Sequence, residues 1–552
     1  MKFKRAPNSR RAERGLADAV ESPLRDLVES SHHTHFLRVL ETGDEALLAR
    51  VHLARAATRS ICVQTFIWGN DETGRFLVWE LLQAAKRGVK VRVIVDQWVA
   101  ALTANVALDV VAFVATAHPN LETKTYNPSL SFEPKGLEVA GQALRDFKGL
   151  NQRMHNKLFL VDDALAVTGG RNIENDYYDR GERRNYRDRD ALVVGPVAQE
   201  MRRSFDEYWA YEHSVDLRAR PDVAKLIAKG GAARFDTRNA FELGDQLDDI
   251  DAAASDPRAV EGGLAEGGYR VRGVQFVADA PGKNPSAGLT GGGLSSNALR
   301  HLLGEARERM VLQSPYLVID DDATRVVAEL RAERPSVEVL VSTNSLAATD
   351  NLSAWALASK QRREVVGELR LRLFELKPVP EEIQLLLPRY SELCKRLEAK
   401  LARGGPLHPL DDNKFEADGV HLSLHAKSYV VDRRTAWIGS FNLDPRSQNL
   451  NTEVGLVIED EEVARAVEAS ILRDAAPGNS WTVAPGPESL LPSLSYSDCF
   501  DLVRGHEPVS CFAPQFRDRY AAVGPYPGVS QSVGDAEMAV LQATATLAEP
   551  IV

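Results

Sequence analysis

The chain has 552 residues, of which 44% are hydrophobic and 26% are charged, a composition typical of globular proteins. A chain of this length exceeds one ordinary hydrophobic core, so we expect roughly two to four domains or subdomains. The net charge of −11 argues against general nucleic-acid binding, which depends on Lys and Arg facing phosphates, and we expect no nucleic-acid partner.

The first segment, residues 1–34, is a basic arm. Against the single acid Glu13, its opening stretch carries the basic residues Lys2, Lys4, Arg5, Arg10, Arg11 and Arg14. Such an arm can lie on an anionic membrane or form a disordered terminus, and the sequence favours neither interpretation. No apolar run reaches the ~18 residues of a membrane span and no secretory signal is recognisable. We therefore expect a cytoplasmic protein in peripheral contact with the inner membrane.

Residues 35–241 form the first predicted half, in which strands and helices alternate. A strand is expected at 59–68, then a helix at 76–88 that ends in a capping glycine, then a buried β-branched strand at 89–96. The half continues to "MHNKLFLVDDALAVTGGRN" at 154–172. This order predicts an α/β fold with a mostly parallel or mixed sheet flanked by helices.

Residues 269–478 form the second predicted half, after an Asp- and Gly-rich linker at 242–268. A strand at 308–318, a helix at 323–334 and a strand at 337–344 repeat the order of the first half. The second half is therefore expected to form a sheet of the same kind.

Four residue types recur in both halves in the same order and at the same spacing. A constant offset of 270 residues relates His155, Lys157, Asp162 and Asn172 to His425, Lys427, Asp432 and Asn442. The earlier strands are offset by 248 or 249 residues, so about 22 extra residues precede the second copy, and a helical insertion at about 381–405 can supply them. Matching copies with matching flanks indicate an internal duplication. Residues 479–552 have no counterpart in the first half and are expected to form a C-terminal tail.

Each copy is expected to bring an imidazole, an ammonium and a carboxamide together. His155 and Lys157 alternate along a short strand and so share a face, and a turn of small residues returns Asn172 beside them. Two facing sets can hold the anionic oxygens of a phosphodiester. One imidazole can attack phosphorus, while the other protonates the leaving alkoxide and deprotonates the incoming alcohol. This chemistry requires no metal, and we expect no cofactor.

A histidine in either role needs an acceptor that fixes its tautomer and supports the imidazolium. Asp190 and Glu453 are the candidates, because each precedes an apolar strand about 30 residues after a motif histidine. Tyr177 and Tyr178 can line the site or pack in the core, and the sequence does not distinguish these alternatives.

The paired segments resemble the HKD motifs of the phospholipase D superfamily, whose members build one active site from two such halves. Within it, the sequences at 169–179, 313–317, 343–350 and 442–456 are similar to bacterial phospholipase D-type cardiolipin synthases, in the branch without N-terminal membrane spans. The resemblance covers about residues 35–475. It implies two phospholipase D-like halves packed about a pseudo-two-fold axis.

The resemblance also implies roles for the motif residues. His155 is expected to be the nucleophile, and His425 the general acid and base. Phosphate is expected to bind to Lys157, Asn172, Lys427 and Asn442, with Ser440 as a further candidate.

In this superfamily the supporting carboxylate comes from the opposite half. Glu453 would then pair with His155, and Asp190 with His425. Asp162 and Asp432 complete the motifs and are expected to stabilise turns.

These observations favour phosphatidyl transfer between glycerophospholipids through a phosphohistidine, with cardiolipin as the expected product. The segment 351–366 and the insertion 381–405 depart from the pattern beside the expected substrate entrance, so the acceptor stays open. Alternatives are headgroup exchange with ethanolamine, alone or beside cardiolipin synthesis, and phospholipase D hydrolysis, with a nuclease less favoured. Expected partners are phosphatidylglycerol, cardiolipin, phosphatidylethanolamine, small alcohols such as ethanolamine, and an anionic membrane.

Overall fold

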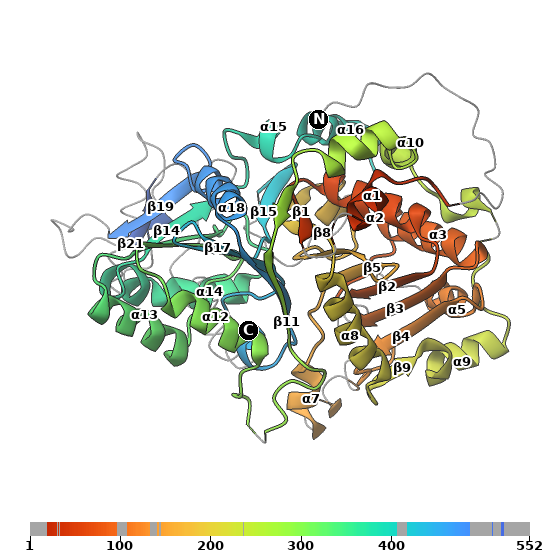
Figure 1. Ribbon diagram of the computed structural model, residues 1–552, viewed down its shortest axis with the longest axis horizontal. Helices are drawn as coiled ribbons and strands as arrows, with labels where there is room; N and C mark the ends of the chain where they lie inside the picture. The colour runs from red at the N-terminus through yellow and green to blue at the C-terminus, as the bar shows by residue number, and fades with distance from the viewer. Residues whose placement is uncertain are drawn as a thin grey trace.

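The computed structural model describes residues 19–485 except 30, 32–33, 97–107, 133–137, 139–140, 143–144, 236, 287 and 406–416, together with the short segments 510–511 and 520–523. Two large sheets of similar construction lie side by side within these residues (Figure 1). Most of the predicted basic arm and of the predicted tail lies outside the described residues.

The first sheet is built from residues of the first predicted half and one strand beyond it. Its spatial order is β10 (Tyr269–Val271), β1 (His35–Leu40), β8 (Asp190–Val194), β6 (Leu165–Gly169), β5 (Leu158–Val161), β2 (Ser60–Thr65), β3 (Lys90–Asp96), β4 (Leu121–Tyr126) and β9 (Ser214–Asp216). Strands β2, β3 and β4 are parallel, and the other neighbours are antiparallel.

The second sheet repeats this arrangement. Its spatial order is β11 (Gly273–Ala278), β18 (Val454–Glu459), β17 (Thr435–Gly439), β16 (Ser428–Val431), β12 (Arg309–Gln313), β13 (Glu338–Asn344), β14 (Arg372–Leu376), β19 (Ser480–Pro485), β21 (Tyr520–Val523) and β20 (Ser510–Cys511). From β11 to β19, neighbouring strands have the same parallel or antiparallel sense as from β1 to β9. The duplication expected from the motif spacing is therefore a duplication of the sheet.

Two strands lie outside the halves as the sequence divided them. Strand β19 occupies the start of the predicted tail and pairs with β14, as β9 pairs with β4. Strand β10 belongs to the predicted second half but extends the first sheet through β1. The sequence missed the equivalence of β19 and β9 because β9 has only three residues and gives little periodic signal.

The two sheets share a central hydrophobic core. Along β8, Ala191 and Val193 face this central core, while Leu192 and Val194 face the outer core of the first half. Helices α8 (Val197–Ala210) and α18 (Glu461–Asp474) contribute to the central core. The outer faces are covered by α2 (Gly43–Ala56) and α3 (Glu72–Lys86) on the first sheet and by α12 (Leu294–Gly304) and α13 (Asp321–Glu333) on the second (Figure 1).

Local sequence explains where the outer helices begin and end. Helix α2 begins after Thr42, whose hydroxyl accepts from the backbone N–H of Glu45, while the Glu45 carboxylate accepts from the backbone of Thr42. Helix α3 begins after Asp71, and the chain leaves it at Gly88 with a φ of 98°. The predicted capping glycine is thereby confirmed, because this conformation favours glycine.

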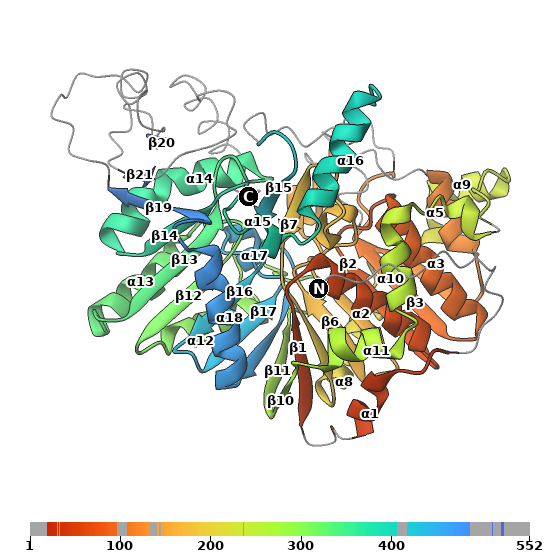
Figure 2. The same cartoon turned by 90° about the horizontal axis from the view of Figure 1, so that it is seen from above.

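Ten further α-helices lie within the described residues. They are α1 (Pro23–Glu29), α5 (Leu108–Thr116), α7 (Phe147–Asn151), α9 (Pro221–Ala228), α10 (Asp248–Ala253), α11 (Pro257–Val260), α14 (Leu352–Arg362), α15 (Ile383–Leu386), α16 (Tyr390–Ala402) and α17 (Pro445–Asn449). The predicted linker contains α10 and α11, and the predicted insertion contains α15 and α16, of which α16 projects from the molecule (Figure 2). Across the described residues, none of the helices combines the length and apolar character needed to cross a bilayer.

A small third sheet joins the two halves. Strand β15 (His421–Leu424) pairs in parallel with β7 (Arg184–Arg187), so a strand of each half leads to the other half. Beneath β15, Leu422 and Leu424 pack against buried leucines of α15 and α16. Because β15 pairs with β7, His425, which follows β15, lies beside the segment of the first half that follows β7.

Candidate active site

The first motif histidine is held by the second half. His155 lies just before β5, and its backbone N–H donates to the carbonyl of Thr452 at 3.0 Å. Its side-chain Nδ1 lies 2.9 Å from Oε2 and 3.1 Å from Oε1 of Glu453. The structure therefore contains the predicted contact between His155 and Glu453.

The second motif histidine is held by the first half, but not by the predicted residue. The backbone N–H of His425 donates to Arg187, and its Nδ1 lies 2.7 Å from Oδ2 of Asp188. Asp190 instead accepts from Arg50 at 2.9 Å. The predicted contact between Asp190 and His425 is therefore wrong.

Strand register explains the difference between the two aspartates. Asp190 pairs with Gly169 in the first sheet, and the residue that pairs with Gly439 in the second sheet is Gly455. Two positions earlier in each strand segment lie Asp188 and Glu453. The equivalent carboxylates are therefore Asp188 and Glu453, and only this register distinguishes Asp188 from Asp190.

Both motif lysines are buried beside their histidines. Lys157 Nζ donates to the carbonyl of His155 at 2.8 Å, and Lys427 Nζ donates to the carbonyl of His425. Lys427 Nζ also lies 3.0 Å from Nε2 of His425. Lys427 Nζ lies 2.7 Å from Nδ1 of the same ring as well. An ammonium carries three donors, so Lys157, with its one hydrogen bond to His155, has donors left for a phosphate oxygen.

The motif asparagines follow the small-residue turns. Asn172 Nδ2 donates to the hydroxyl of Tyr177 at 2.8 Å, and this hydroxyl lies 3.5 Å from Nε2 of His425. Asn442 is held through its backbone N–H, which donates to Ser447 Oγ at 3.2 Å. Of the two tyrosines that the sequence left undecided, Tyr177 therefore reaches the site, whereas Tyr178 packs under the guanidinium of Arg50.

Ser440, a further candidate for phosphate binding, contacts the carboxylate of Glu453. Its hydroxyl donates to Oε2 of Glu453, and Ser447 donates to Oε1 at 2.7 Å. In the first half Gly170 takes the place of Ser440, and a β-carbon there would overlap the carboxylate of Asp188. In the second half the turn binds Glu453 through the hydroxyl of Ser440. In the first half the absence of a side chain at Gly170 leaves room for the carboxylate of Asp188.

Asp162 and Asp432, which we expect to stabilise turns, lie at equivalent positions of two hairpins. Each lies in the left-handed region, with φ of 53° and 52°, and each is followed by a second such residue in its hairpin. The Asp162 carboxylate accepts from the backbone of Thr58, Arg59 and Ser60. The equivalent acceptor contacts of Asp432 are with the backbone of Arg307, Glu308 and Arg309.

Burial shifts the ionisation of the site. Burial, followed by the charge of Lys157, lowers the pKa of His155 well below its ordinary value. Burial and Lys427 lower the pKa of His425 to about 4, although Asp188 opposes this shift. Burial raises the pKa of Glu453 to about 7. Both imidazoles are therefore neutral in the resting site, and Nδ1–H donation to a carboxylate leaves Nε2 as the nitrogen for chemistry.

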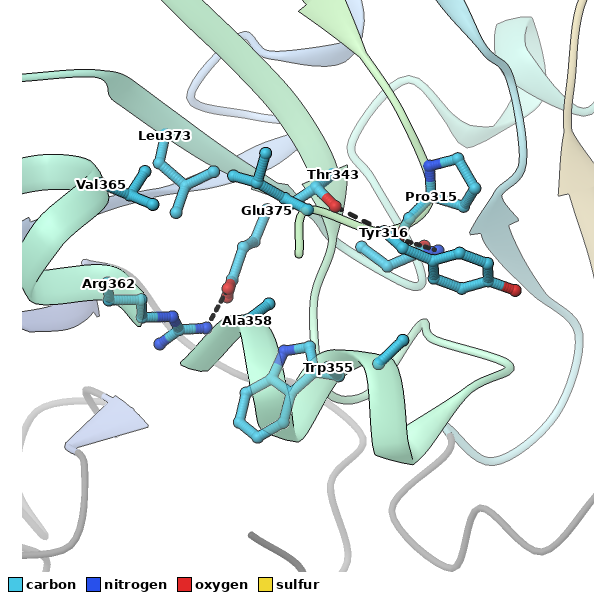
Figure 3. Close-up of a pocket in the computed structure, with 12 residues that line it drawn as sticks. Pro315, Tyr316, Thr343, Trp355, Ala358, Arg362, Val365, Leu373 and Glu375 are labelled. Carbon is cyan, nitrogen blue, oxygen red and sulfur yellow. Dashed lines mark hydrogen bonds and ion pairs between the residues drawn. The ribbon is translucent and has the colours of Figure 1, made fainter. Parts of the chain in front are cut away.

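A pocket that the sequence did not predict lies at the ends of β12, β13 and β14 (Figure 3). Arg362 and Glu375 form a buried ion pair on its wall, and Trp355 lies over the guanidinium. Tyr316, also on the wall, donates to Oδ1 of Asp350 at 2.9 Å. The carboxylate of Asp350 lies between the two halves and thus links this pocket to the site.

Asp350 connects this pocket to the ring of His425. Its Oδ2 accepts from the hydroxyl of Tyr186 at 3.0 Å. The ring of Tyr186 lies 5.0 Å from that of His425 and 4.4 Å from that of Tyr177. The aromatic surroundings of His425 were missed because isolated tyrosines carry no spacing signal.

The duplicated fold and the crossed pairs of histidine and carboxylate define a member of the phospholipase D superfamily. A family model described as "Cardiolipin synthase, PLD-like domain" matches residues 51–209 and 299–475. The chain belongs to this cardiolipin synthase family with phospholipase D-like domains, and it is a phosphatidyltransferase.

Individual relatives agree with the family model. Cardiolipin synthase C of Escherichia coli K12 is 31% identical over 435 residues, which is 79% of this chain and 83% of that protein. Cardiolipin synthase A of Pseudomonas aeruginosa PAO1 is 25% identical over 451 residues, 81% of this chain and 68% of that protein. The crystal structure of phosphatidylserine synthase from Haemophilus influenzae has the same fold, with a TM-score of 0.54, 14% identity, and coverage of 96% of this chain and 99% of that chain.

Proposed function

We propose that this chain makes cardiolipin by transferring a phosphatidyl group through a phosphohistidine at His155. The observation that carries the proposal is the crossed arrangement, in which each imidazole is held through Nδ1 by a carboxylate of the opposite half. Two imidazoles held in this way can divide the work of a nucleophile and of a proton carrier.

In the first step, Nε2 of His155 forms a bond to the phosphorus of phosphatidylglycerol. The phosphorus–oxygen bond to the glycerol headgroup breaks, and the imidazolium of His425 gives its proton to the leaving oxygen. Lysine ammonium groups and asparagine amides stabilise the charge that develops on the non-bridging oxygens. The residues in this last role are Lys157, Asn172, Lys427 and Asn442.

In the second step, neutral His425 takes the proton of a primary hydroxyl on a second phosphatidylglycerol. That oxygen bonds to phosphorus while the bond to His155 breaks. Two molecules of phosphatidylglycerol become one cardiolipin and one glycerol, and both histidines return to their starting states.

The electrostatics of the site suit an anionic substrate. The resting pKa of His425 is about 4, too low for a general acid at neutral pH. A bound phosphodiester adds negative charge beside two buried ammonium groups, and nearby negative charge raises the pKa of an imidazole. Substrate binding therefore favours the imidazolium of His425, which takes from solvent the proton that the first step consumes.

A lipid assay tests the proposal. Purified protein is incubated with vesicles of headgroup-labelled phosphatidylglycerol, with and without ethanolamine, and the lipids are identified by mass spectrometry. Cardiolipin and free glycerol are the expected products. Phosphatidylethanolamine formed only when ethanolamine is added would indicate headgroup exchange, and phosphatidic acid alone would indicate hydrolysis. Cleaved nucleic acid with unchanged lipids would contradict the proposal.

Trapping experiments test the division of roles. With a p-nitrophenyl ester of phosphatidic acid, the leaving group needs no proton, so His425→Ala should accumulate a phosphoryl-enzyme that cannot be resolved. His155→Ala should form none. Accumulation in His155→Ala and not in His425→Ala would reverse the roles.

We also propose peripheral contact with an anionic bilayer of the inner membrane through the basic segment 1–14. Its charges favour such contact by about 1 kcal/mol for each basic residue near the surface. Removal of residues 2–14 should weaken co-sedimentation with phosphatidylglycerol vesicles but not with phosphatidylcholine vesicles. Equal binding before and after removal would contradict this contact.

A further inference from the structure

A buried ion pair that has no role in the proposed reaction steps contacts the backbone of Glu453. Lys283 Nζ and Asp279 Oδ2 are 2.8 Å apart, and each side chain is 1% exposed. Both residues lie in the turn between β11 and α12, outside the repeated motifs. Burial of two charges is costly, so a pair retained here calls for a specific role.

The ion pair holds Glu453 through its backbone. Asp279 Oδ2 accepts from the backbone N–H of Glu453 at 3.0 Å, and the backbone N–H of Asp279 donates to the carbonyl of Glu453 at 2.9 Å. These reciprocal bonds fix the chain direction at the residue that supports His155.

The ion pair also reaches the side chain of Glu453. Lys283 Nζ donates to the carbonyl of Ser447 at 2.7 Å, and Ser447 Oγ donates to Oε1 of Glu453 at 2.7 Å. Asp279 therefore holds the backbone of Glu453, and Lys283 holds its side-chain carboxylate through Ser447.

The glycine-rich sequence that precedes α12 closes over the ion pair. A β-carbon at Gly293 would overlap Asp279 Oδ1 and crowd the Lys283 side chain. The backbone N–H of Ser295 donates to Asp279 Oδ1 at 2.9 Å, and Ser295 Oγ donates to the carbonyl of Glu453. This segment, which the function otherwise leaves unexplained, thus belongs to the support of Glu453.

We propose that Asp279 and Lys283 are positioning residues that hold Glu453 in place against His155 and balance its charge. The proposal rests on the proposed role of His155 as the nucleophile. The positive charge of Lys283 favours the ionised form of Glu453. The negative charge of Asp279 partly cancels this effect of Lys283 on Glu453.

Electrostatics support the proposal in direction. Burial raises the pKa of Glu453 to about 7, while Lys157 and Lys283 lower it. The charged and titratable groups that interact with Glu453 from all sides are His155, Lys157, Asp279, Lys283, Lys427, Tyr429, Asp444 and Arg446. Removal of one cation from this set favours the protonated carboxyl, and removal of one anion favours the carboxylate.

In the first half, a different ion pair occupies the position equivalent to Asp279 and Lys283. Glu41 follows β1 as Asp279 follows β11, but Glu41 pairs with Arg187 at 2.7 Å and Arg189 at 2.7 Å. These two arginines flank Asp188, the carboxylate that supports His425. Each half thus has an ion pair beside its supporting carboxylate. The pair beside Glu453 is buried and contains a lysine, whereas Glu41 in the first half is 29% exposed and pairs with arginines.

Opposite charge changes test the proposal. Lys283→Met should move the acid limb of the kcat/KM profile to higher pH by about one unit, and Asp279→Asn should move it to lower pH. Lys283→Arg keeps the charge and should restore the native limb. The substrate is bis(p-nitrophenyl) phosphate, which reports attack at phosphorus without a lipid acceptor. An NMR titration of the His155 imidazole in the substrate-free enzyme should shift in the same directions.

A buried pair remote from the site provides the control. Glu80 pairs with Arg55 between α2 and α3, and Glu80→Gln should lower the melting temperature without moving either titration. Shifts of opposite sign in the Lys283→Met and Asp279→Asn variants support the proposal. Loss of activity in both with unmoved titrations would show a merely structural role and overturn it.

Two further outcomes are also decisive. If Lys283→Met does not fold, an unmoved titration in folded Asp279→Asn overturns the proposal, and a downward shift supports it. If wild-type protein makes no cardiolipin yet the NMR shifts appear, the proposed function fails while the positioning role stands.

Discussion

At the scale of single residues, two aspartates two positions apart have different partners: Asp188 contacts His425, and Asp190 contacts Arg50. Asp188→Asn should lower kcat by roughly a hundredfold with little change in stability, because the amide can accept from His425 but cannot balance an imidazolium. Asp190→Asn leaves Arg50 with an uncharged partner in the core and should lower the free energy of unfolding by about 3 kcal/mol. Steady-state kinetics and urea unfolding of both variants check this. Equal effects of the two substitutions on both quantities would contradict it.

The pKa of Glu453 predicts a pH-dependent stability. It is raised from 4.5 to about 7, so between these values the native state holds a proton that the unfolded chain has lost. The resulting stabilisation is complete below about pH 4.5 and is lost as pH rises through about 7. Glu453→Gln does not titrate. The free energy of unfolding of wild type, relative to this variant, should fall by up to about 3 kcal/mol across the window, and a constant difference would contradict the prediction.

Residue identities at the site were predictable from sequence to the extent that spacing encodes them. The eight motif positions emerged from repetition. Glu453 was a candidate because it precedes an apolar strand about 30 residues after His425, and its pairing with His155 was implied by the resemblance to the superfamily. Asp188 did not emerge as a candidate, because two aspartates alternate with arginines before β8 and only strand register distinguishes them. Lys283 lies in no repeat, and its function depends on contacts with distant segments, which a single sequence does not show.

At the scale of secondary-structure elements, the turns after β6 and β17 illustrate how a duplicated element diverges. Gly170→Ala should lower kcat at least tenfold, because the new methyl group overlaps the Asp188 carboxylate and displaces it from His425. Ser440→Ala removes one hydrogen bond to Glu453 but adds no bulk, so a smaller loss is expected. The kcat values of the two variants and a crystal structure of Gly170→Ala check this prediction. A larger loss in Ser440→Ala would contradict it.

The same scale shows why some elements were easier to predict than others. The β-branched run of β3 and its counterpart β13 are buried strands with a clear composition signal. Strand β9 is short and partly exposed, and β19 lies where Pro and Ser content suggested a tail. Their place in the sheets follows from pairing with β4 and β14, which is a tertiary property.

At the scale of the whole molecule, the duplicated halves depend on one another. The central core contains residues of both sheets, and each histidine finds its carboxylate in the opposite half. Repetition in the sequence predicted two similar sheets but not this interlocking, because offsets along a chain carry no information on how the copies face each other. The proposed phosphodiester site at the junction requires that the halves form one cooperative unit.

A substitution in the central core tests this cooperativity. Ile438 in β17 is fully buried in that core, and Ile438→Ala should lower the free energy of unfolding by about 3 kcal/mol. Because the core is shared, native-state hydrogen exchange should speed up by the same free energy in β2 and β3 of the first half as in β12 and β13 of the second. Leu294→Ala, at a side chain that is 62% exposed, is the control and should change neither. Faster exchange confined to the second half would mean that the halves unfold separately, and the shared core would then not make the molecule cooperative.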